Sequence, residues 1–144
     1  MLISTKGRYA LRVLAELGSY DRNCYIPLPA IAKNQEISEK YLEIIISTLV
    51  KAGFVEGMRG KGGGYRLKRD PKDYSVGEIL RLTEGSLAPV ACLESKKNEC
   101  PRADKCLTLP IWTKLDNIIE TYLDSVSLND LCCAKNAEKV PYKV

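Results

Sequence analysis

The apolar residues of the first half of the chain recur at the spacing of amphipathic helices. Ser4 and Thr5 can cap a first helix, and Pro29 suits the first turn of a short second helix. Ser38 can cap a third helix, and a fourth is predicted at about 75–83. The expected core-facing residues are Ala10, Val13, Leu14, Leu17, Leu42, Ile45, Ile46, Leu49, Val76, Ile79, Leu80 and Leu82.

Two short strands are predicted between the third and fourth helices. Residues 54–56 and 65–67 have strand character, and the glycines between them indicate a turn. One helix, a pair of helices joined by a tight turn, and a hairpin, in that order, predict a winged helix-turn-helix. The turn reads NQEIS and has Glu36 where many such turns have glycine. A left-handed backbone at Glu36 would cost on the order of 1 kcal/mol.

A second amphipathic segment follows a polar one. Residues 84–106 are predicted to be a loop, and the apolar residues at 111–126 keep helical spacing over about four turns. One small core cannot cover all of them, so we expect this helix to form a homodimer interface. The expected interface residues are Trp112, Leu115, Ile119 and Tyr122.

The predicted fold class is therefore mainly α, a winged helix-turn-helix with a two-stranded wing and a long C-terminal dimerisation helix. The DNA-binding domain is expected at 1–86 and a cysteine-bearing sensor loop at 87–106. The dimerisation helix with its C-terminal end is expected at 107–131, and a tail at 132–144.

Composition is that of an ordinary globular protein, with 144 residues, 45% of them hydrophobic and 28% charged. No apolar run approaches the roughly 18 residues of a membrane span, and the N-terminus lacks the apolar core of a signal peptide. We therefore expect a cytoplasmic protein with no membrane partner. In the cytoplasm, six cysteines favour metal binding or redox chemistry over structural disulfides.

Enzymatic activity is not expected. The chain has no histidine, so it can build neither a common catalytic triad nor a histidine general base. It also lacks the Cys-x-x-Cys motif of thioredoxin-like oxidoreductases.

The outward face of the third helix carries residues suited to DNA. Lysines at 40 and 51 and Ser47 can reach phosphates or base edges. Glu43 can accept a hydrogen bond from a cytosine amino group, and Ile44 can contact a thymine methyl group. The hairpin adds five basic residues within eleven positions, which suits phosphate and minor-groove contact. These are Arg59, Lys61, Arg66, Lys68 and Arg69. The alternative is a solvated charged surface.

The segments STKGRYALRVLAEL, ISEKYLE, LVKAGFVEGMRGKGGGYRL and VGEILRLTEG resemble the IscR-type (Rrf) group of winged-helix transcriptional regulators. The resemblance extends from about Met1 to Leu131, and RGKGGGY is its most specific part. It implies a homodimeric repressor that binds a pseudo-palindromic site in double-stranded DNA. Arg59 would enter the minor groove, and Glu43 would take part in base choice. The residues expected to contact DNA are Ser4, Lys6, Arg8, Ser38, Lys40, Tyr41, Glu43, Ile44, Arg59 and Lys61.

Three cysteines in the predicted loop, Cys92, Cys100 and Cys106, have the spacing C-x7-C-x5-C. Thiolates suit iron–sulfur clusters, and sensors of the group that the chain resembles hold a cluster with three cysteines in this region. The resemblance therefore implies one 2Fe–2S cluster per subunit, with these three cysteines as its metal ligands.

The fourth cluster ligand stays open in the sequence. Leu109 stands where the best-known relative has histidine, and Arg8 stands where a nitric-oxide-sensing relative has aspartate. The first cysteine spacing is also two residues longer than in the best-known relative. The candidates, apart from a hydroxide, are Glu94, Glu99, Asp104, Thr108 and Cys24.

Two other interpretations of the loop remain. One is a metal-free thiol redox switch, because the lysines and arginines of the loop favour the thiolate form. The other is a regulator of cysteine or sulfur metabolism that responds to a partner protein. Zinc is less consistent, since the close C-x2-C pairs that it prefers are absent. Cys24, Cys132 and Cys133 are interpreted as small buried or incidental thiols.

Overall fold

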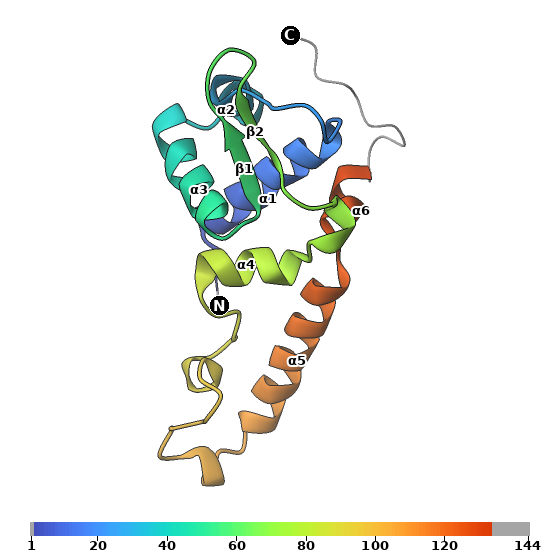
Figure 1. Ribbon diagram of the computed structural model, residues 1–144. Helices are drawn as coiled ribbons and strands as arrows, with labels where there is room; N and C mark the ends of the chain where they lie inside the picture. The colour runs from blue at the N-terminus through green and yellow to red at the C-terminus, as the bar shows by residue number, and fades with distance from the viewer. Residues whose placement is uncertain (1, 134–144) are drawn as a thin grey trace.

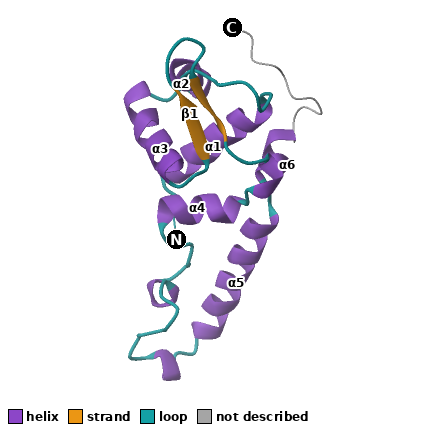
Figure 2. Cartoon of the chain, in the orientation of Figure 1, coloured by secondary structure: helices purple, strands orange, loops and turns teal. Residues whose placement is uncertain are grey.

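The structure, a computed structural model, describes residues 2–133 (Figure 1). Three helices, one hairpin and a fourth helix follow each other in the order predicted for a winged helix-turn-helix (Figure 2). The elements are α1 (Thr5–Ser19), α2 (Leu28–Gln35), α3 (Glu39–Lys51), β1 (Val55–Met58), β2 (Gly64–Leu67), α4 (Val76–Glu84), α5 (Leu109–Ser125) and α6 (Leu128–Cys133). None of the helices within residues 2–133 is long and apolar enough to cross a membrane.

Serine side chains cap the N-termini of three of these helices. The hydroxyl oxygens of Ser4, Ser38 and Ser75 each accept a hydrogen bond from the backbone N–H three residues ahead, at 3.0–3.2 Å. Such a bond satisfies one of the backbone donors that the first turn of a helix leaves without a partner. The helix starts predicted at Ser4 and Ser38 are thereby confirmed.

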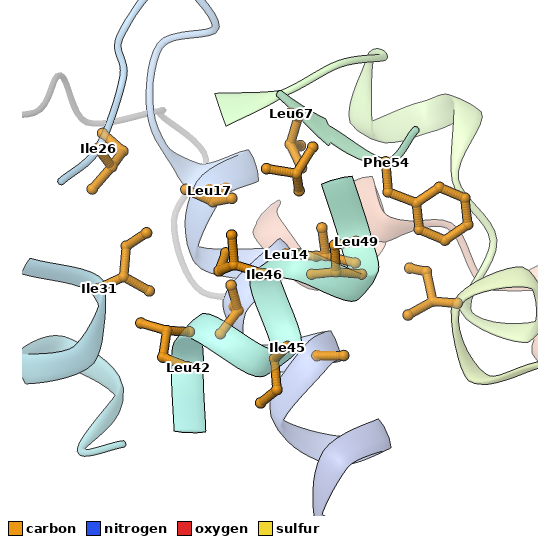
Figure 3. Packing of buried hydrophobic residues seen from close by; sticks show 14 of the residues in the cluster. Leu14, Leu17, Ile26, Ile31, Leu42, Ile45, Ile46, Leu49, Phe54 and Leu67 are labelled. Carbon is orange, nitrogen blue, oxygen red and sulfur yellow. The ribbon is translucent and has the colours of Figure 1, made fainter. Parts of the chain in front are cut away.

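The main core lies where α1, α2, α3 and the hairpin meet (Figure 3). The predicted core-facing residues of α1 and α3 are all at most 5% exposed. Burying each leucine or isoleucine contributes about 1.5–3 kcal/mol relative to leaving it in water. The labelled members of this core are Leu14, Leu17, Ile26, Ile31, Leu42, Ile45, Ile46, Leu49, Phe54 and Leu67.

The wing is an antiparallel hairpin in which Val55 pairs with Leu67. A third segment extends it, because Ile26 and Tyr65 exchange two backbone hydrogen bonds of 2.8 and 2.9 Å. Gly64 lies against this segment with φ of 152°, and a Cβ at Gly64 would overlap the Ile26 carbonyl. Glycine is therefore required where the hairpin meets the chain that leads into α2.

The tight turn between α2 and α3 adopts the left-handed conformation without glycine. Glu36 has φ of 54° and ψ of 45°. The preceding residue is held in place, since Arg12 donates to the backbone carbonyl of Gln35 and to its side-chain oxygen, the latter at 3.1 Å. Glu16 also accepts a hydrogen bond from the Gln35 amide at 2.8 Å. These contacts hold a turn whose backbone is unfavourable for glutamate.

Helix α4 is joined to α5 by ion pairs of one arginine. Arg81 forms ion pairs with Glu120 and with Asp124, the latter at 2.6 Å. The hydrogen bond to Asp124 raises the pKa of Arg81 above its ordinary value. Gly77 makes the close approach possible, since a Cβ there would overlap the Asp124 carboxylate.

A second apolar cluster also joins α4 to the α5 region. Ile119, Leu123 and Val126 of the α5 region pack against the buried side chains of Val76, Leu80 and Leu87. One face of α5 is therefore covered within the same chain.

Helix α6 corrects the prediction that a polar tail begins at residue 132. The helix continues to Cys133 and packs against α1, where the Cys132 thiol donates to the Ala15 carbonyl at 3.3 Å. Ser127 and Asp130 cap it reciprocally through each other's backbone N–H, at 2.8 and 3.2 Å. This Ser-x-x-Asp capping box is the sequence signal that indicates a helix here. The remainder of the predicted tail lies outside the described residues.

Replacing Glu36 by glycine should stabilise the protein. Relief of the left-handed strain, about 1 kcal/mol, exceeds the extra backbone entropy of glycine in the unfolded chain, so we expect a gain of about 0.5 kcal/mol. Urea unfolding measures this change. The control is Glu39→Gly in the first turn of α3, which should instead destabilise by about 0.5–1 kcal/mol. Equal losses for both variants would show that the Glu36 backbone is not strained.

Candidate nucleic-acid interface and cysteine loop

The solvent-facing side of α3 carries the predicted base-reading residues. Lys40, Glu43 and Ile44 are exposed and point away from the core that the opposite face of α3 builds. Tyr41 is only half-exposed, because its ring packs edge-on against Tyr9 at 5.9 Å between centroids. Three of the predicted α3 residues are therefore fully presented to a ligand, and Tyr41 also supports the fold.

The tip of the wing presents two cations. Arg59 and Lys61 are exposed in the turn between β1 and β2. Gly60 and Gly62 flank Lys61 with φ of 92° and 76°, which L-residues with side chains adopt at a cost. The RGKGGGY sequence thus builds a tight tip that projects two positive charges.

Arg66, counted in the basic cluster of the sequence, has a structural role. Its Nε pairs with Glu56 at 2.7 Å across the hairpin, and its guanidinium lies 4.4 Å from the Tyr25 ring centroid. The hydrogen bond to Glu56 raises the pKa of Arg66. This side chain fastens the wing to the segment before α2.

Arg69 is likewise engaged. Its guanidinium stacks over the rings of Tyr74 and Phe54, at 4.3 and 5.1 Å from their centroids, and pairs with Glu78 at 3.1 Å. Tyr74 itself is buried, which raises the pKa of its phenol, and its hydroxyl donates to the Phe54 carbonyl at 2.6 Å. The basic cluster available to DNA is therefore smaller than the sequence count of five.

The N-terminal end of α1 carries the remaining predicted contacts. Arg8 is exposed and Lys6 is half-exposed. Ser4 is already engaged, since its hydroxyl donates to Glu84 at 2.5 Å while it caps α1. Its role as a DNA contact stays a prediction.

The cysteine loop connects α4 to α5 and extends away from the other helices and the wing (Figure 1). Cys92 is half-buried in a short 3-10 helix, Ala91–Leu93, and Cys100 is exposed. Cys106 is half-buried and directly follows a second such helix, Ala103–Lys105. Within residues 2–133, no three cysteine, aspartate or glutamate side chains are gathered closely enough to hold a metal ion. The donor set suits a cluster, but this conformation of the loop does not assemble it.

Cys106 is the thiol whose environment favours its ionised form. Its sulfur lies 3.4 Å from the Thr108 hydroxyl, which also accepts a hydrogen bond from the Trp112 indole N–H at 3.3 Å. Hydrogen bonds from the side chain and backbone of Thr108 lower the pKa of Cys106, and the charge of Arg102 adds a smaller effect. A thiolate is the form that binds metals and reacts with oxidants.

The outer face of α5 shows a continuous apolar stripe. Ile111, Leu115, Ile118 and Tyr122 are between 38% and 64% exposed and follow each other at intervals of four, three and four residues. Ile119, predicted as an interface residue, instead packs inward, and Trp112 is half-exposed. The heptad-like spacing is the signal that selects Ile111 and Ile118, which the sequence interpretation did not place at the interface.

Sequence profiles identify the family. The profile of Rrf2, described as iron-dependent transcriptional regulators, matches residues 3–134. The chain belongs to the Rrf2 family. A similar Rrf2 protein is the HTH-type transcriptional regulator IscR of Photobacterium profundum. It is 34% identical over 140 residues, which are 97% of this chain and 80% of that protein.

Solved structures of two Rrf2 proteins are similar to this one. CymR (YrzC), the global cysteine regulator of B. subtilis, has a TM-score of 0.77 and 34% identity, covering 93% of this chain and 98% of its own. T. potens IscR has a TM-score of 0.75 and 36% identity, covering 100% of this chain and 93% of its own. The predicted family, the mainly helical winged fold and the absence of an enzymatic role are confirmed.

Thr108→Val tests the environment of Cys106. Without the hydroxyl, the pKa of Cys106 should rise toward its ordinary value, so alkylation by iodoacetamide should reach half its maximal rate at a higher pH. A pH series read by mass spectrometry measures this in a background where the other two loop cysteines are serine. Thr113→Val, at an exposed site on α5, should leave the midpoint unchanged. An unshifted midpoint in Thr108→Val would contradict the assignment.

Proposed function

We propose that this Rrf2-family regulator is a homodimeric repressor whose operator binding is controlled by a 2Fe–2S cluster on Cys92, Cys100 and Cys106. The observation that carries the proposal is the place of the three thiols. They occupy one polar loop between the DNA-binding domain and α5, the helix expected to join two subunits. A change in this loop therefore acts between the two parts that set the geometry of a DNA-binding dimer.

The loop has few apolar side chains that could pack together and hold it in one conformation. Its central stretch, 94–106, has no fully buried residue. Ligand binding can supply the ordering free energy that such a segment lacks, as metal sites do in small domains. The bound cluster would supply iron that reacts with oxygen or nitric oxide. Thr108 would hold Cys106 as the thiolate that such a site requires.

The fourth ligand of the proposed cluster has more than one candidate. Thr108 already lies next to Cys106, whereas none of the loop carboxylates joins two cysteines in a metal-binding group within the described chain. A second subunit or a hydroxide can also supply the fourth ligand. A weak ligand would leave one iron accessible, which suits a sensor.

A metal-free regulator of cysteine or sulfur metabolism is the second candidate. The observation that favours it is the similarity to CymR, described as a global cysteine regulator. In this alternative the Cys106 thiolate would itself be the redox sensor, or a partner protein would bind the same fold.

On DNA, each subunit of the proposed dimer would present one α3 and one wing to half of a pseudo-palindromic site. Glu43 and Ile44 would contact base edges in the major groove, and Arg59 would enter the adjacent minor groove. Lys40, Lys61, Lys6 and Arg8 would contact phosphates. The proposed division of the chain is a DNA-binding domain at 1–86, a sensor loop at 87–106 and a dimerisation segment at 107–131.

Leu115→Asp tests the dimer. The stripe on α5 is apolar and exposed, so a carboxylate at its centre should prevent association and leave a folded monomer. Sedimentation velocity measures the change. The matched control is Thr113→Asp, which adds the same charge on the opposite, exposed side of α5 and should remain dimeric. A stable Leu115→Asp dimer would mean that the subunits meet elsewhere.

Cysteine variants test the cluster after anaerobic purification and reconstitution. Cys92→Ala, Cys100→Ala and Cys106→Ala should each lose the visible absorption, because each removes one iron ligand. Cys132→Ala should retain it, since that thiol is hydrogen-bonded to α1. Full iron and sulfide in all three loop variants would place the site elsewhere. A colourless, iron-free wild-type protein whose DNA binding responds to oxidant would favour the thiol switch.

A further inference from the structure

The C-terminal end of α5 is fixed to the start of α4 by backbone hydrogen bonds. The N–H of Val76 donates to the Val126 carbonyl at 2.8 Å, and the N–H of Leu128 donates to the Tyr74 carbonyl at 2.9 Å. These four residues form the α4–α5 corner, from which α5 extends away from α4 toward the cysteine loop (Figure 1). A helix held at one end can swing about that end unless a second contact fixes its direction.

Arg81 supplies this second contact. It lies more than one turn beyond Val76 on α4, and its guanidinium reaches two carboxylates of α5. One terminal nitrogen pairs with Glu120, and the other pairs with Asp124 at 2.6 Å. Glu120 and Asp124 are one helical turn apart on the same side of α5. The two ion pairs therefore fix both the angle between α4 and α5 and the rotation of α5 about its own axis.

The apolar contacts at the same junction are less directional. Ile119 and Leu123 of α5 pack against a cluster that includes Leu80 of α4. The hydrophobic effect depends on the area removed from water and has no preferred direction. The planar guanidinium of Arg81, in contrast, presents its two terminal nitrogens in a fixed geometry, which the single ammonium of a lysine cannot reproduce. Arg81 is therefore the contact that selects one direction for α5.

The direction of α5 matters because the outer face of this helix is the proposed dimer interface. Two DNA-binding domains joined through α5 would hold their α3 helices at a separation and a twist set by the two α4–α5 corners. We propose that Arg81 determines which spacing between operator half-sites the dimer accepts. Arg81 is a positioning residue, since it acts through α5. The inference rests on the proposed homodimer and adds the residue that selects the spacing.

The geometry of DNA gives the size of the movement that Arg81 would prevent. One added base pair moves two half-sites apart by about 3.4 Å and turns them by about 35° relative to each other. Shared between two subunits, this change is about 1.7 Å and about 17° for each. Helix α5 has 17 residues and is about 25 Å long, so a swing of about 10° moves its far end by about 4 Å. Small rotations at the corner therefore decide whether a neighbouring spacing can be bound.

Arg81→Lys tests the inference because it keeps the charge and removes the second donor nitrogen. An operator is selected from random duplexes, and derivatives have one base pair added or removed between the half-sites. Fluorescence anisotropy measures binding at equal iron content. The wild-type protein should bind the altered spacings about tenfold more weakly. For Arg81→Lys this penalty should fall by about threefold, since a freer α5 lets the second α3 reach its half-site. A merely destabilised variant would lose affinity on all three duplexes alike and keep the wild-type penalty.

Two further variants separate the ion pairs of Arg81 from general effects. Arg22→Lys is the matched control, because Arg22 pairs with Asp70 at 4.0 Å outside the α4–α5 junction. It should keep the wild-type penalty. Asp124→Ala removes one partner of Arg81 and should lower the penalty as Arg81→Lys does, and the double variant should lower it no further. On a duplex with a single half-site, every variant should bind as the wild-type protein does, since α3 and the wing are unchanged.

The outcomes separate this inference from the function on which it rests. If the wild-type protein discriminates between spacings and Arg81→Lys does so equally, Arg81 does not set the spacing and the inference is wrong, while the proposed dimer stands. Equal wild-type affinity for all three spacings, or weaker binding of Arg81→Lys to the single half-site, would also overturn it. If the wild-type protein sediments as a monomer, the proposed dimer fails and the inference fails with it.

Discussion

The ion pairs of Arg81 with Glu120 and Asp124 connect the two parts of this molecule. They join α4, the helix that follows the wing, to α5, the helix with the exposed apolar stripe. Both pairs lie at a partly exposed surface, where a single ion pair contributes little. Here the charges lie beside an apolar cluster and a glycine that admits Asp124, so charge, packing and backbone fix the same arrangement. The direction in which α5 leaves the domain follows from this junction.

The cysteine loop begins at the C-terminal end of α4, beside the start of α1. Glu84, the last residue of α4, accepts hydrogen bonds from both the backbone N–H and the hydroxyl of Ser4. A Cβ at Gly7 would overlap this carboxylate, so the two helix ends approach as closely as glycine permits. The short helix that carries Cys92 follows within a few residues and lines a cavity together with Leu2 and Ile3. The proposed sensor loop is thus adjacent to one of the expected phosphate-binding regions and is joined to α5 at its other end.

Some of the surface cations stabilise the fold, and others are free to contact a ligand. Arg66 and Arg69 stack on aromatic rings and pair with glutamates, which holds the wing against the domain. Arg59, Lys61 and Lys51 project from the same region and are exposed. The net charge is only +4, so a DNA-binding face depends on local charge, and these three exposed cations lie where α3 and the wing meet.

The sequence by itself determined the elements whose residues interact locally. Apolar spacing and serine caps predicted α1, α3 and α4 with their buried faces, and the glycine-rich turn predicted the wing. It also showed that Glu36 would have to adopt a left-handed backbone if the helix-turn-helix formed, and Glu36 has φ of 54°. These features depend on residues within a few positions of each other, so local sequence patterns are enough to predict them.

Only the tertiary structure decided which side of α5 remains uncovered and which cations remain exposed. Ile118 and Ile119 are neighbours with the same side chain, yet one is exposed and the other packs against α4. The difference comes from contacts with residues some 40 positions away, which helical spacing cannot specify. For the same reason, the sequence alone assigns Arg66 and Arg69 to a basic cluster. The structure shows that they are engaged by Glu56, Tyr25 and Glu78. Long-range packing, which no local pattern encodes, determines which of these side chains are exposed.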